Sequence, residues 1–425
     1  MRFPMAGFLV AALIGCAVPA RAEQVTIVCG LVPQSIELCR SGSEAWAKAR
    51  GQEVRVLAYP DSSTRARELV GDLLEAQAED LDVLELDIVW PGVLAPQLLD
   101  LGTAPDAQAQ GHFPAAVASF TVADRLRAIP WYLSVGRLLY RTDLLERYGL
   151  AVPTSWEELA TAARTIQEGE RTTGHADFWG FLWQGRIGEG LTANAVEWLA
   201  SAGAPGILEQ DGAVHVDDPR SAIALGRAAS WVGTISPGGV LDMGGGNSLA
   251  SFLAGNAAFL RYWSNGMALT DAADSKVSGQ AGMAELPAGD GQGGRHVALL
   301  GGAGLAVSRH SRKPELAKDL VRWLTSAEEQ KRRALAGAFE PSLQPLYQDP
   351  ELLARMPYFP ALEGAFETAI LRPAVLAGGN YDAVSRAVAT TVHAILERSR
   401  QPEPALADLA ITLRRLGPGR QRIGS

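Results

Sequence analysis

The chain has 425 residues, of which 47% are hydrophobic and 20% charged, and its formal net charge is −9 at pH 7. A chain of this length exceeds the size at which one hydrophobic core stops growing, so two lobes are expected. The acidic balance argues against nucleic acid, and against an anionic membrane surface, as the main partner.

The N-terminus has the pattern of an export signal. Arg2 precedes the apolar run FLVAALIG, which is too short to span a bilayer, and ARA ending at Ala22 fits a signal-peptidase site. We therefore expect residues 1–22 to be a signal peptide cleaved after Ala22, with a periplasmic mature protein. The alternative is a lipoprotein anchored through Cys16, because LIGC also fits a lipoprotein box. No later stretch has 18 continuous apolar residues, so no membrane span is expected.

Two cysteines remain beyond the signal, Cys29 and Cys39. Their spacing is not CxxC, and no histidine cluster accompanies them. In an oxidising compartment such a close pair favours a disulfide, which would join the end of the first strand to the first helix. Two buried free thiols are the alternative.

The first part of the chain alternates strand and helix patterns. Strands are predicted at 24–28, 53–57 and 82–89, and helices through 44–48 and over 65–77. This order predicts a parallel sheet with helices on both faces.

The remaining elements continue the α/β pattern. The stretch PWYLSVG, residues 130–136, suggests a change of chain direction before a short strand at 138–140. A helix is predicted over 141–148, and a capping box at Thr154 and Glu157 opens another that ends near Gln167. Further on, strands are predicted at 257–261 and 296–300 and helices at 314–325, 361–370 and 381–396, with a glycine-rich loop at 237–247 and glycines 301, 302 and 304 after the second strand.

Motifs for nucleophilic, phosphate-binding and zinc chemistry are absent from the sequence. There is no GxSxG, GxxxxGK[ST] or HExxH, and the six histidines are scattered. We therefore expect no catalytic residue, no metal and no cofactor.

Aromatic and charged residues gather instead at predicted strand ends. Asp87 closes a strand, Tyr132 follows Pro130, Trp263 ends another strand, and Arg372 follows a helix. In open α/β sheets, ligands bind at the carboxyl ends of strands. Sugars suit this mixture, because their rings pack on aromatic planes while carboxylates and guanidiniums bind their hydroxyls.

Several blocks resemble a known family. They are LDIVWPGVLAPQLLDL, PWYLSVGRLLYRTDLLERYGL, PTSWEELATAARTI, FWGFLWQGRIGEGL, GNAAFLRYW and LLGGAGLAVSRHSRKPELAKDLVRWLTS. In order along nearly the whole mature chain, they resemble the extracellular solute-binding proteins of sugar ABC importers, family 1, and most closely the trehalose/maltose/α-glucoside branch.

This resemblance implies a two-lobed "Venus flytrap" α/β fold, in which each lobe is a mainly parallel sheet flanked by helices and three crossings join the lobes. The first crossing is expected near residues 133–135. The implied N-terminal lobe is 23–132 plus 300–328, and the implied C-terminal lobe is 133–299 plus 329–425.

The resemblance also implies which residues bind the ligand. The first set is Asp61, Asp87, Tyr132, Trp263, Gly302 and Arg372. A second set of candidate positions is Ser35, Trp131, Ser134, Trp183, Asn265 and Ala303. Four of the second set depart from the branch, which carries acidic residues at 35 and 134, an aromatic residue at 265 and a tryptophan at 303. Losing that tryptophan predicts a roomier cleft.

The function implied is capture of a carbohydrate, a di- or oligosaccharide, between the lobes and its delivery to the permease subunits of an ABC transporter in the inner membrane by a monomeric protein. Two alternatives remain. The same fold could bind a polyol or a small organic anion, since Arg372 is retained while acidic positions are lost. A secreted glycosidase would need two carboxylates about 5–9 Å apart, for which Asp87 and Glu85 are the only neighbouring pair.

Overall fold

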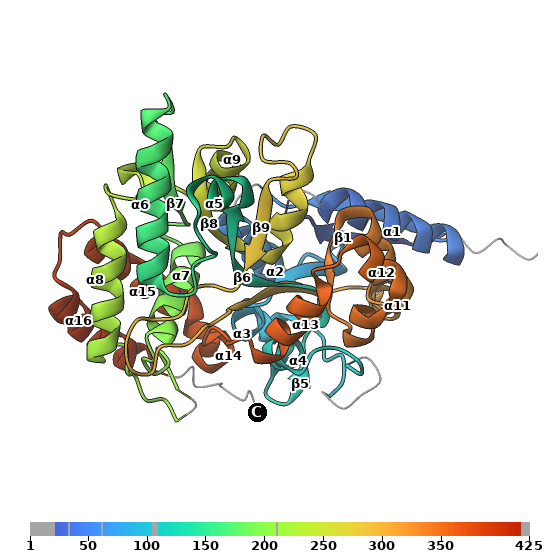
Figure 1. The fold of residues 1–425 in the computed structure, drawn as a ribbon. Helices are drawn as coiled ribbons and strands as arrows, with labels where there is room; N and C mark the ends of the chain where they lie inside the picture. The colour runs from blue at the N-terminus through green and yellow to red at the C-terminus, as the bar shows by residue number, and fades with distance from the viewer. Residues whose placement is uncertain (1–21, 33–34, 61–62, 104–108, 210, 418–425) are drawn as a thin grey trace, which may run out of the picture.

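The computed structural model describes residues 22–32, 35–60, 63–103, 109–209 and 211–417 (Figure 1). The predicted signal peptide, Cys16 and Asp61 lie outside these ranges. Within them, no helix combines the length and the apolar character needed to cross a bilayer.

The first sheet has the predicted β-α-β-α-β order. Its elements are β1 (Gln24–Cys29), α1 (Ser35–Arg50), β2 (Glu53–Ala58), α2 (Ser63–Glu75) and β3 (Val83–Asp87). Strand β1 pairs in parallel with β2 and β3. Strand β10 (Leu300–Val307) joins on the other side of β3 and runs antiparallel to it. The central strand is buried almost throughout, because helices cover the sheet.

A disulfide joins Cys29, the last residue of β1, to Cys39 in α1. Both cysteines are completely buried. The predicted pairing is therefore confirmed, and it ties the first helix to the strand it covers.

Strand β6 (Ile129–Arg141) links two sheets as one continuous element. Up to Val135 it pairs with β10, and from Gly136 onward it pairs with β8 (Ala257–Trp263). The expected turn before a short strand is therefore wrong. The strand is buried for most of its length, and its apolar and aromatic residues favour an extended conformation in such a buried sheet. Pro130 is accommodated where the register with β10 shifts.

The second sheet is built on the later half of β6. Strand β7 (Trp179–Leu182) runs parallel to β8, whereas β9 (Ala281–Ala284) runs antiparallel to β6. Parallel pairing therefore dominates only among β1, β2 and β3. The helices of this half include α5 (Thr142–Tyr148), α6 (Trp156–Thr172), α7 (Glu189–Ser201), α8 (Pro219–Trp231), α9 (Gly245–Leu253), α15 (Tyr381–Leu396) and α16 (Pro402–Leu416).

The capping box of α6 lies one residue later than predicted. Ser155 is the N-cap, and its side chain accepts from the backbone N–H of Glu158, whose carboxylate accepts from the N–H of Ser155. Adjacent Thr and Ser both satisfy the pattern, so the sequence alone did not separate them.

The chain returns to the first sheet through α10 (Pro314–Leu324), α11 (Ala327–Gly337), β11 (Glu340–Pro341), α12 (Pro350–Arg355) and α13 (Phe359–Thr368). Helix α11 packs on α1, and α13 packs on α4 (Pro114–Phe120). We call β1–β3 and β10, together with helices α1, α2, α4 and α10–α13, the N-lobe. We call β7–β9, together with helices α5–α9, α15 and α16 of the second sheet, the C-lobe. Residues 329–368, expected in the C-terminal lobe, pack on the N-lobe, so we propose that the chain leaves it near Ile370.

Three chain segments pass between the lobes side by side. The backbone N–H of Gly136 donates to Leu299, at 3.1 Å, and that of Leu300 donates to Ile370, at 2.9 Å. Figure 1 shows β6 running between α6, α7 and α8 on one side and α11 and α12 on the other. The first passage changes sheet between Val135 and Gly136, next to the expected position.

The strand predicted at 296–300 begins only at Leu300 and runs through the glycines to Val307. Glycines normally weaken a strand, but here they allow close packing. A Cβ at Gly301 would lie 2.8 Å from both Ser134 Oγ and Trp263 Cζ3. The glycines are therefore part of the interlobe packing and do not form a turn.

Candidate functional site

The strand ends of both lobes meet beside the three passages. Asp87 ends β3 and faces Ala303 of β10, which in turn faces Tyr132 of β6. Trp263 ends β8 and faces Gly136 of β6. The register of β6 and β10 therefore brings the candidate residues Asp87 and Trp263, from different lobes, to the same region.

Asp87 supplies a half-buried carboxylate from the N-lobe. Its Oδ1 accepts from the backbone N–H of Val89 at 3.2 Å. Burial raises the pKa of Asp87, while the positive charge of Arg372 opposes that shift. A hydroxyl of a ligand is a suitable partner for the rest of this carboxylate.

Arg372 supplies a buried guanidinium held from the C-lobe side. Its Nη1 donates to Glu189 Oε1 at 2.8 Å, and its Nη2 donates to the carbonyl of Leu300 at 3.3 Å. Its Nε is buried and has no hydrogen-bond partner among the described residues. Glu189 also accepts from Tyr381 Oη at 2.5 Å and from Ser385 Oγ at 2.6 Å. The guanidinium is therefore fixed in place, and its Nε is among the donors left for a further acceptor.

Two guanidiniums lie close to the ring of Trp263. The Cζ of Arg261 is 4.5 Å, and that of Arg372 is 5.8 Å, from the centre of its ring. The side chain is half-buried. An indole oriented by cations, with part of its surface exposed, can pack against a sugar ring.

Arg261 is itself neutralised by Glu197. Both side chains are almost completely buried, and Arg261 Nε donates to Glu197 Oε2 at 2.7 Å. Burial raises the pKa of Glu197, an effect that Arg261 opposes. This ion pair fixes the support on which Trp263 packs.

Tyr132 is anchored within the N-lobe. Its hydroxyl donates to Glu85 Oε1 at 2.7 Å, and its ring makes an edge contact with Phe339. Glu85 also accepts from the backbone N–H of Gly30 at 2.6 Å. Tyr132 is only 5% exposed, and its hydroxyl is already bound to Glu85. The ligand contact expected of this hydroxyl is therefore not available in this structure. Glu85 is the carboxylate next to Asp87 that a glycosidase would need as its second catalytic group, and it is already bound by Tyr132 and Gly30.

Gly302 has a backbone conformation that favours glycine, with φ of 137°. A Cβ there would lie 2.9 Å from the Cα of Leu133. Its carbonyl accepts from the backbone N–H of Ile88 at 3.1 Å, next to Asp87. Gly302 therefore holds the Asp87 loop against the first passage.

Two tryptophans of the second candidate set belong to the core instead. Trp131 and Trp183 are both 0% exposed. Trp131 donates to the carbonyl of Leu324 and carries the guanidinium of Arg333 3.7 Å from its ring centre. Trp183 donates to Ser236 and makes an edge contact with Trp198. Neither ring is accessible to a ligand in this structure, because aromatic and cationic neighbours enclose it.

The other departures from the family pattern are mostly buried. Ser35 is 0% exposed and donates to the carbonyl of Val32, while Ser134 is 7% exposed and lies close to Gly301, as Trp263 does. Ala303 is also 0% exposed, so the missing tryptophan does not open space at this position. Asn265 differs, because its Oδ1 is buried without a hydrogen-bond partner among the described residues.

A cavity of about 460 Å³ adjoins this cluster at Arg372. Its lining comes from both lobes, including Val89 and Ser119 on one side and Leu199 and Ile207 on the other. The lining is mainly aliphatic and includes no aromatic ring among its described residues. The cavity lacks Asp87 and Trp263, so the polar cluster suits a sugar better than this cavity does.

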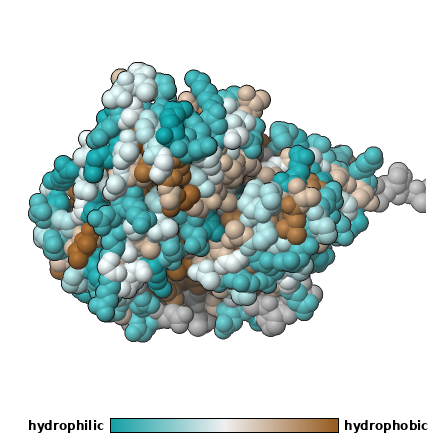
Figure 2. Space-filling model, viewed as in Figure 1, coloured by the Kyte–Doolittle hydropathy of each residue, from teal (hydrophilic) through white to brown (hydrophobic). Residues whose placement is uncertain are grey.

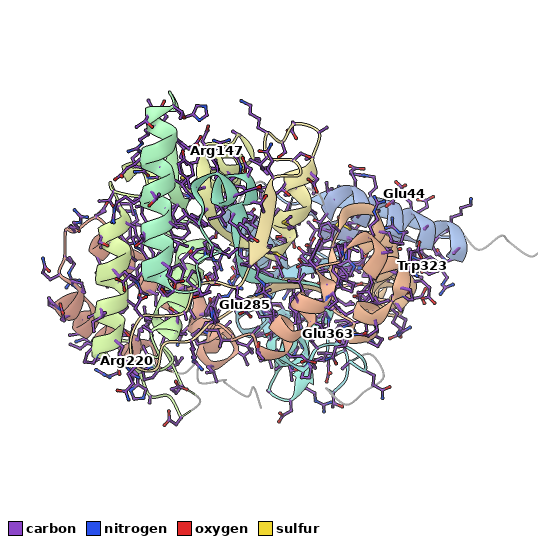
Figure 3. All side chains as sticks on the ribbon, in the orientation of Figure 1. Glu44, Arg147, Arg220, Glu285, Trp323 and Glu363 are labelled. Atoms are coloured by element: carbon purple, nitrogen blue, oxygen red, sulfur yellow. A yellow bond between two sulfur atoms is a disulfide. The ribbon has the colours of Figure 1, made fainter. Side chains whose placement is uncertain are left out.

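Contacts between the lobes close the region around the cluster. Arg67 of α2 lies 3.1 Å from Asp382 of α15. Helix α3 (Pro91–Leu94) packs on α14 (Ala374–Ala377). Arg137 donates to the carbonyl of Ala361 in α13 and lies 3.9 Å from Glu285, which is labelled near the middle of the molecule in Figure 3.

Glu340 places a buried carboxyl at the first passage. Its Oε2 accepts from Ser264 Oγ at 2.7 Å, and Ser264 Oγ accepts from the backbone N–H of Val135 at 3.0 Å. Its Oε1 is buried without a hydrogen-bond partner among the described residues. Burial raises the pKa of Glu340 to about 8, against the opposing effects of Ser264 and Arg137.

We expect Glu340 to make the protein less stable as pH rises from about 4.5 to about 8. Its usual pKa is 4.5, so in this window the folded state holds a proton that the unfolded state releases. The Glu340→Gln variant should lose this slope, by up to about 1.4 kcal/mol per pH unit. Urea unfolding at pH 5, 6.5 and 8 measures it. Glu285→Gln, at an exposed carboxylate, is the control; equal slopes for wild type and Glu340→Gln would contradict the expectation.

The sequence carries no local signal for the partners that hold the site together. These partners are Glu189, Glu197, Tyr381 and Ser385. Glu189 and Arg372 are 183 residues apart, and such a pairing has no local signal. The alternating strand pattern did place Glu85 beside Asp87, but it could not show that Tyr132 binds it.

Two lobes joined by three adjacent passages, with a charged and aromatic cluster between them, define a two-lobed periplasmic binding protein. The chain belongs to the bacterial extracellular solute-binding protein family, whose model matches residues 43–331. A relative from Deinococcus radiodurans, a probable ABC transporter-binding protein, is 40% identical over 399 residues, which cover 93% of this chain and 94% of the relative. The expected family and fold are thereby confirmed.

Solved structures agree with this assignment. Maltose-bound MalE3 of T. maritima has a TM-score of 0.86 and 34% sequence identity, and the match covers 93% of this chain and 100% of MalE3. The GacH receptor of Streptomyces glaucescens, solved unliganded and with acarbose, has a TM-score of 0.81 at 21% identity, covering 93% of this chain and 98% of the receptor. The second likeness supports the fold alone.

Proposed function

We propose that this protein is the substrate-binding component of an ABC importer and captures a carbohydrate between its lobes. The observation that carries the proposal is the interlobe cluster, in which the N-lobe contributes Asp87 and the C-lobe contributes Trp263 with Arg372. Carboxylate and guanidinium groups bind hydroxyls, and an indole binds the apolar face of a sugar ring.

Binding at this position links capture to closure. A ligand that contacts Asp87 on one lobe and Trp263 on the other stabilises the closed arrangement over an open one. The closed form then presents its cargo to permease subunits in the inner membrane. We propose a monomeric protein, exported by cleavage after Ala22, with anchoring through Cys16 as the alternative. The face seen in Figure 2 is mainly hydrophilic with small separate apolar spots, as suits an exported monomer.

The carbohydrate we propose is an α-linked glucose disaccharide such as maltose. MalE3, which shares a third of its residues with this chain, was solved with maltose. Which of these disaccharides is preferred depends on Asn265, which stands where the family pattern has an aromatic residue. Its Oδ1 has no hydrogen-bond partner among the described residues and can accept from a sugar hydroxyl. A polyol or a small organic anion is the alternative ligand.

We propose binding without turnover. Glycoside hydrolysis needs one carboxylate as acid and a second as base or nucleophile. Asp87 has no such partner among its described neighbours, because Glu85 is bound by Tyr132 and Glu189 by Arg372. Incubation with maltose should therefore release no glucose.

Ligand-induced thermal stabilisation tests the proposal, using maltose, trehalose, maltotriose, ribitol and citrate. Ligand at a hundredfold excess over Kd adds about 2.7 kcal/mol to the stability of the folded state. We expect a shift with an α-linked sugar that Asp87→Asn removes. Asp72→Asn, at an exposed carboxylate of α2, is the matched control and should keep the shift. A shift only with ribitol or citrate, or one unaffected by Asp87→Asn, would overturn the carbohydrate assignment at this cluster.

A further inference from the structure

We propose that Glu189 sets the charge selectivity of the site, so that the protein accepts neutral or cationic sugars and rejects anionic ones. This inference rests on the proposed function, and it names the class of carbohydrate that the site admits. Glu189 acts through Arg372 and is therefore a positioning residue for it.

A free, buried guanidinium would favour an anion. Arginine presents a planar fork of donors that matches a carboxylate or phosphate in a bidentate manner. In Arg372 that fork is partly occupied, because Nη1 donates to Glu189 and Nη2 donates to the carbonyl of Leu300. Its Nε is left for a hydroxyl of a ligand, while the charge of the guanidinium is already offset by the carboxylate of Glu189.

Glu189 is held firmly in this role from two helices. It is the first residue of α7, and it accepts from Tyr381 and Ser385 of α15. Ser385 is fixed in turn by Thr192, whose Oγ1 lies 2.9 Å from Ser385 Oγ. An incoming anion would have to displace a carboxylate that three partners bind, so exchange for a ligand carboxylate is unfavourable.

The charges around the site add to the same preference. Asp87, Glu189 and Glu197 supply three carboxylates, whereas Arg261 and Arg372 supply two guanidiniums. With Asp87 ionised the cluster is negative, and with Asp87 protonated it is neutral. In both states each guanidinium is already paired with a carboxylate. No unpaired positive charge is therefore left in the cluster to compensate an anionic ligand for its lost hydration.

The preference is therefore built by rejection of the wrong ligand as well as by attraction of the right one. Glu189 is 24% exposed, so its charge borders the space next to Arg372 and is not sealed in the core. Removing that single charge should weaken the hold on Nη1 of Arg372 and leave the cluster one unit more positive.

The test compares maltose with two anionic analogues by titration calorimetry. Maltobionate carries a carboxylate at the reducing end, and a glucuronyl-glucose disaccharide carries one on the other ring, so either orientation of the sugar is covered. We expect the wild type to bind maltose at least tenfold more tightly than either anion. In Glu189→Gln this ratio should fall at least tenfold for one of the anions.

Two further variants separate charge from structure. Glu189→Asp keeps the charge and should still exclude the anions, even if maltose binds more weakly. Glu397→Gln removes one charge from the far end of α15, about 24 Å from Tyr381 along the helix, and should leave the ratio unchanged.

The outcomes distinguish the inference from the proposed function. If the wild type binds no saccharide, the proposed function fails. If the wild type binds maltose and Glu189→Gln changes the ratio by less than twofold, the function stands and the selectivity inference is wrong. An equal change in Glu397→Gln would also overturn the inference, because the effect would then follow net charge and not Arg372.

Discussion

Replacing Arg261 by methionine should destabilise the protein by about 3–5 kcal/mol. Arg261 and Glu197 are 0% and 1% exposed, and the variant leaves the Glu197 carboxylate buried without its partner. The free energy of unfolding from urea titration measures the loss.

Two comparisons make this result specific. Arg220→Met removes a partly exposed arginine, paired with Asp218 at the start of α8, and should cost less than about 1 kcal/mol (Figure 3). The double variant Arg261→Met with Glu197→Leu removes both charges and should recover most of the stability. If Arg261→Met lowers the free energy of unfolding no more than Arg220→Met does, the buried Glu197 carboxylate does not need Arg261 as its partner.

Replacing Trp263 by alanine should weaken maltose binding at least thirtyfold. A tryptophan that a ligand covers in a binding site commonly contributes about 2 kcal/mol or more. Trp263 is held by Arg261 and Arg372 at the end of β8, where the expected sugar face would pack. Titration calorimetry at one temperature gives the Kd of each protein.

Trp179→Ala is the matched control for this experiment. Trp179 also lies in the C-lobe sheet, at the start of β7, and packs on Arg171 away from the interlobe residues. It should change the Kd for maltose by less than twofold. If Trp263→Ala binds maltose as the wild type does, while Asp87→Asn does not, the ligand sits on the N-lobe side only and closure needs another contact.

The sequence predicted those parts of the protein that depend on neighbours along the chain. The alternation of strands and helices over the first 90 residues, the helix at 381–396 and the pairing of Cys29 with Cys39 all agree with the structure. Each depends on hydrophobic period, capping residues or short loop closure, which are local properties.

Resemblance to the family located the strand-end residues but not their partners. Asp87, Trp263 and Arg372 do converge between the lobes, whereas Trp131 and Trp183 are enclosed in the hydrophobic core. Both kinds of tryptophan occur in apolar strands, and only packing from distant helices decides which ring stays accessible.

The amino-acid sequence by itself determined the α/β architecture and the residue types offered to a ligand. Only the tertiary structure decided that glycines 301–304 form part of a strand and that Arg372 pairs with Glu189. The reason is physical: the atoms that neutralise a charge, or that leave room only for a glycine, are close in space but far away along the chain.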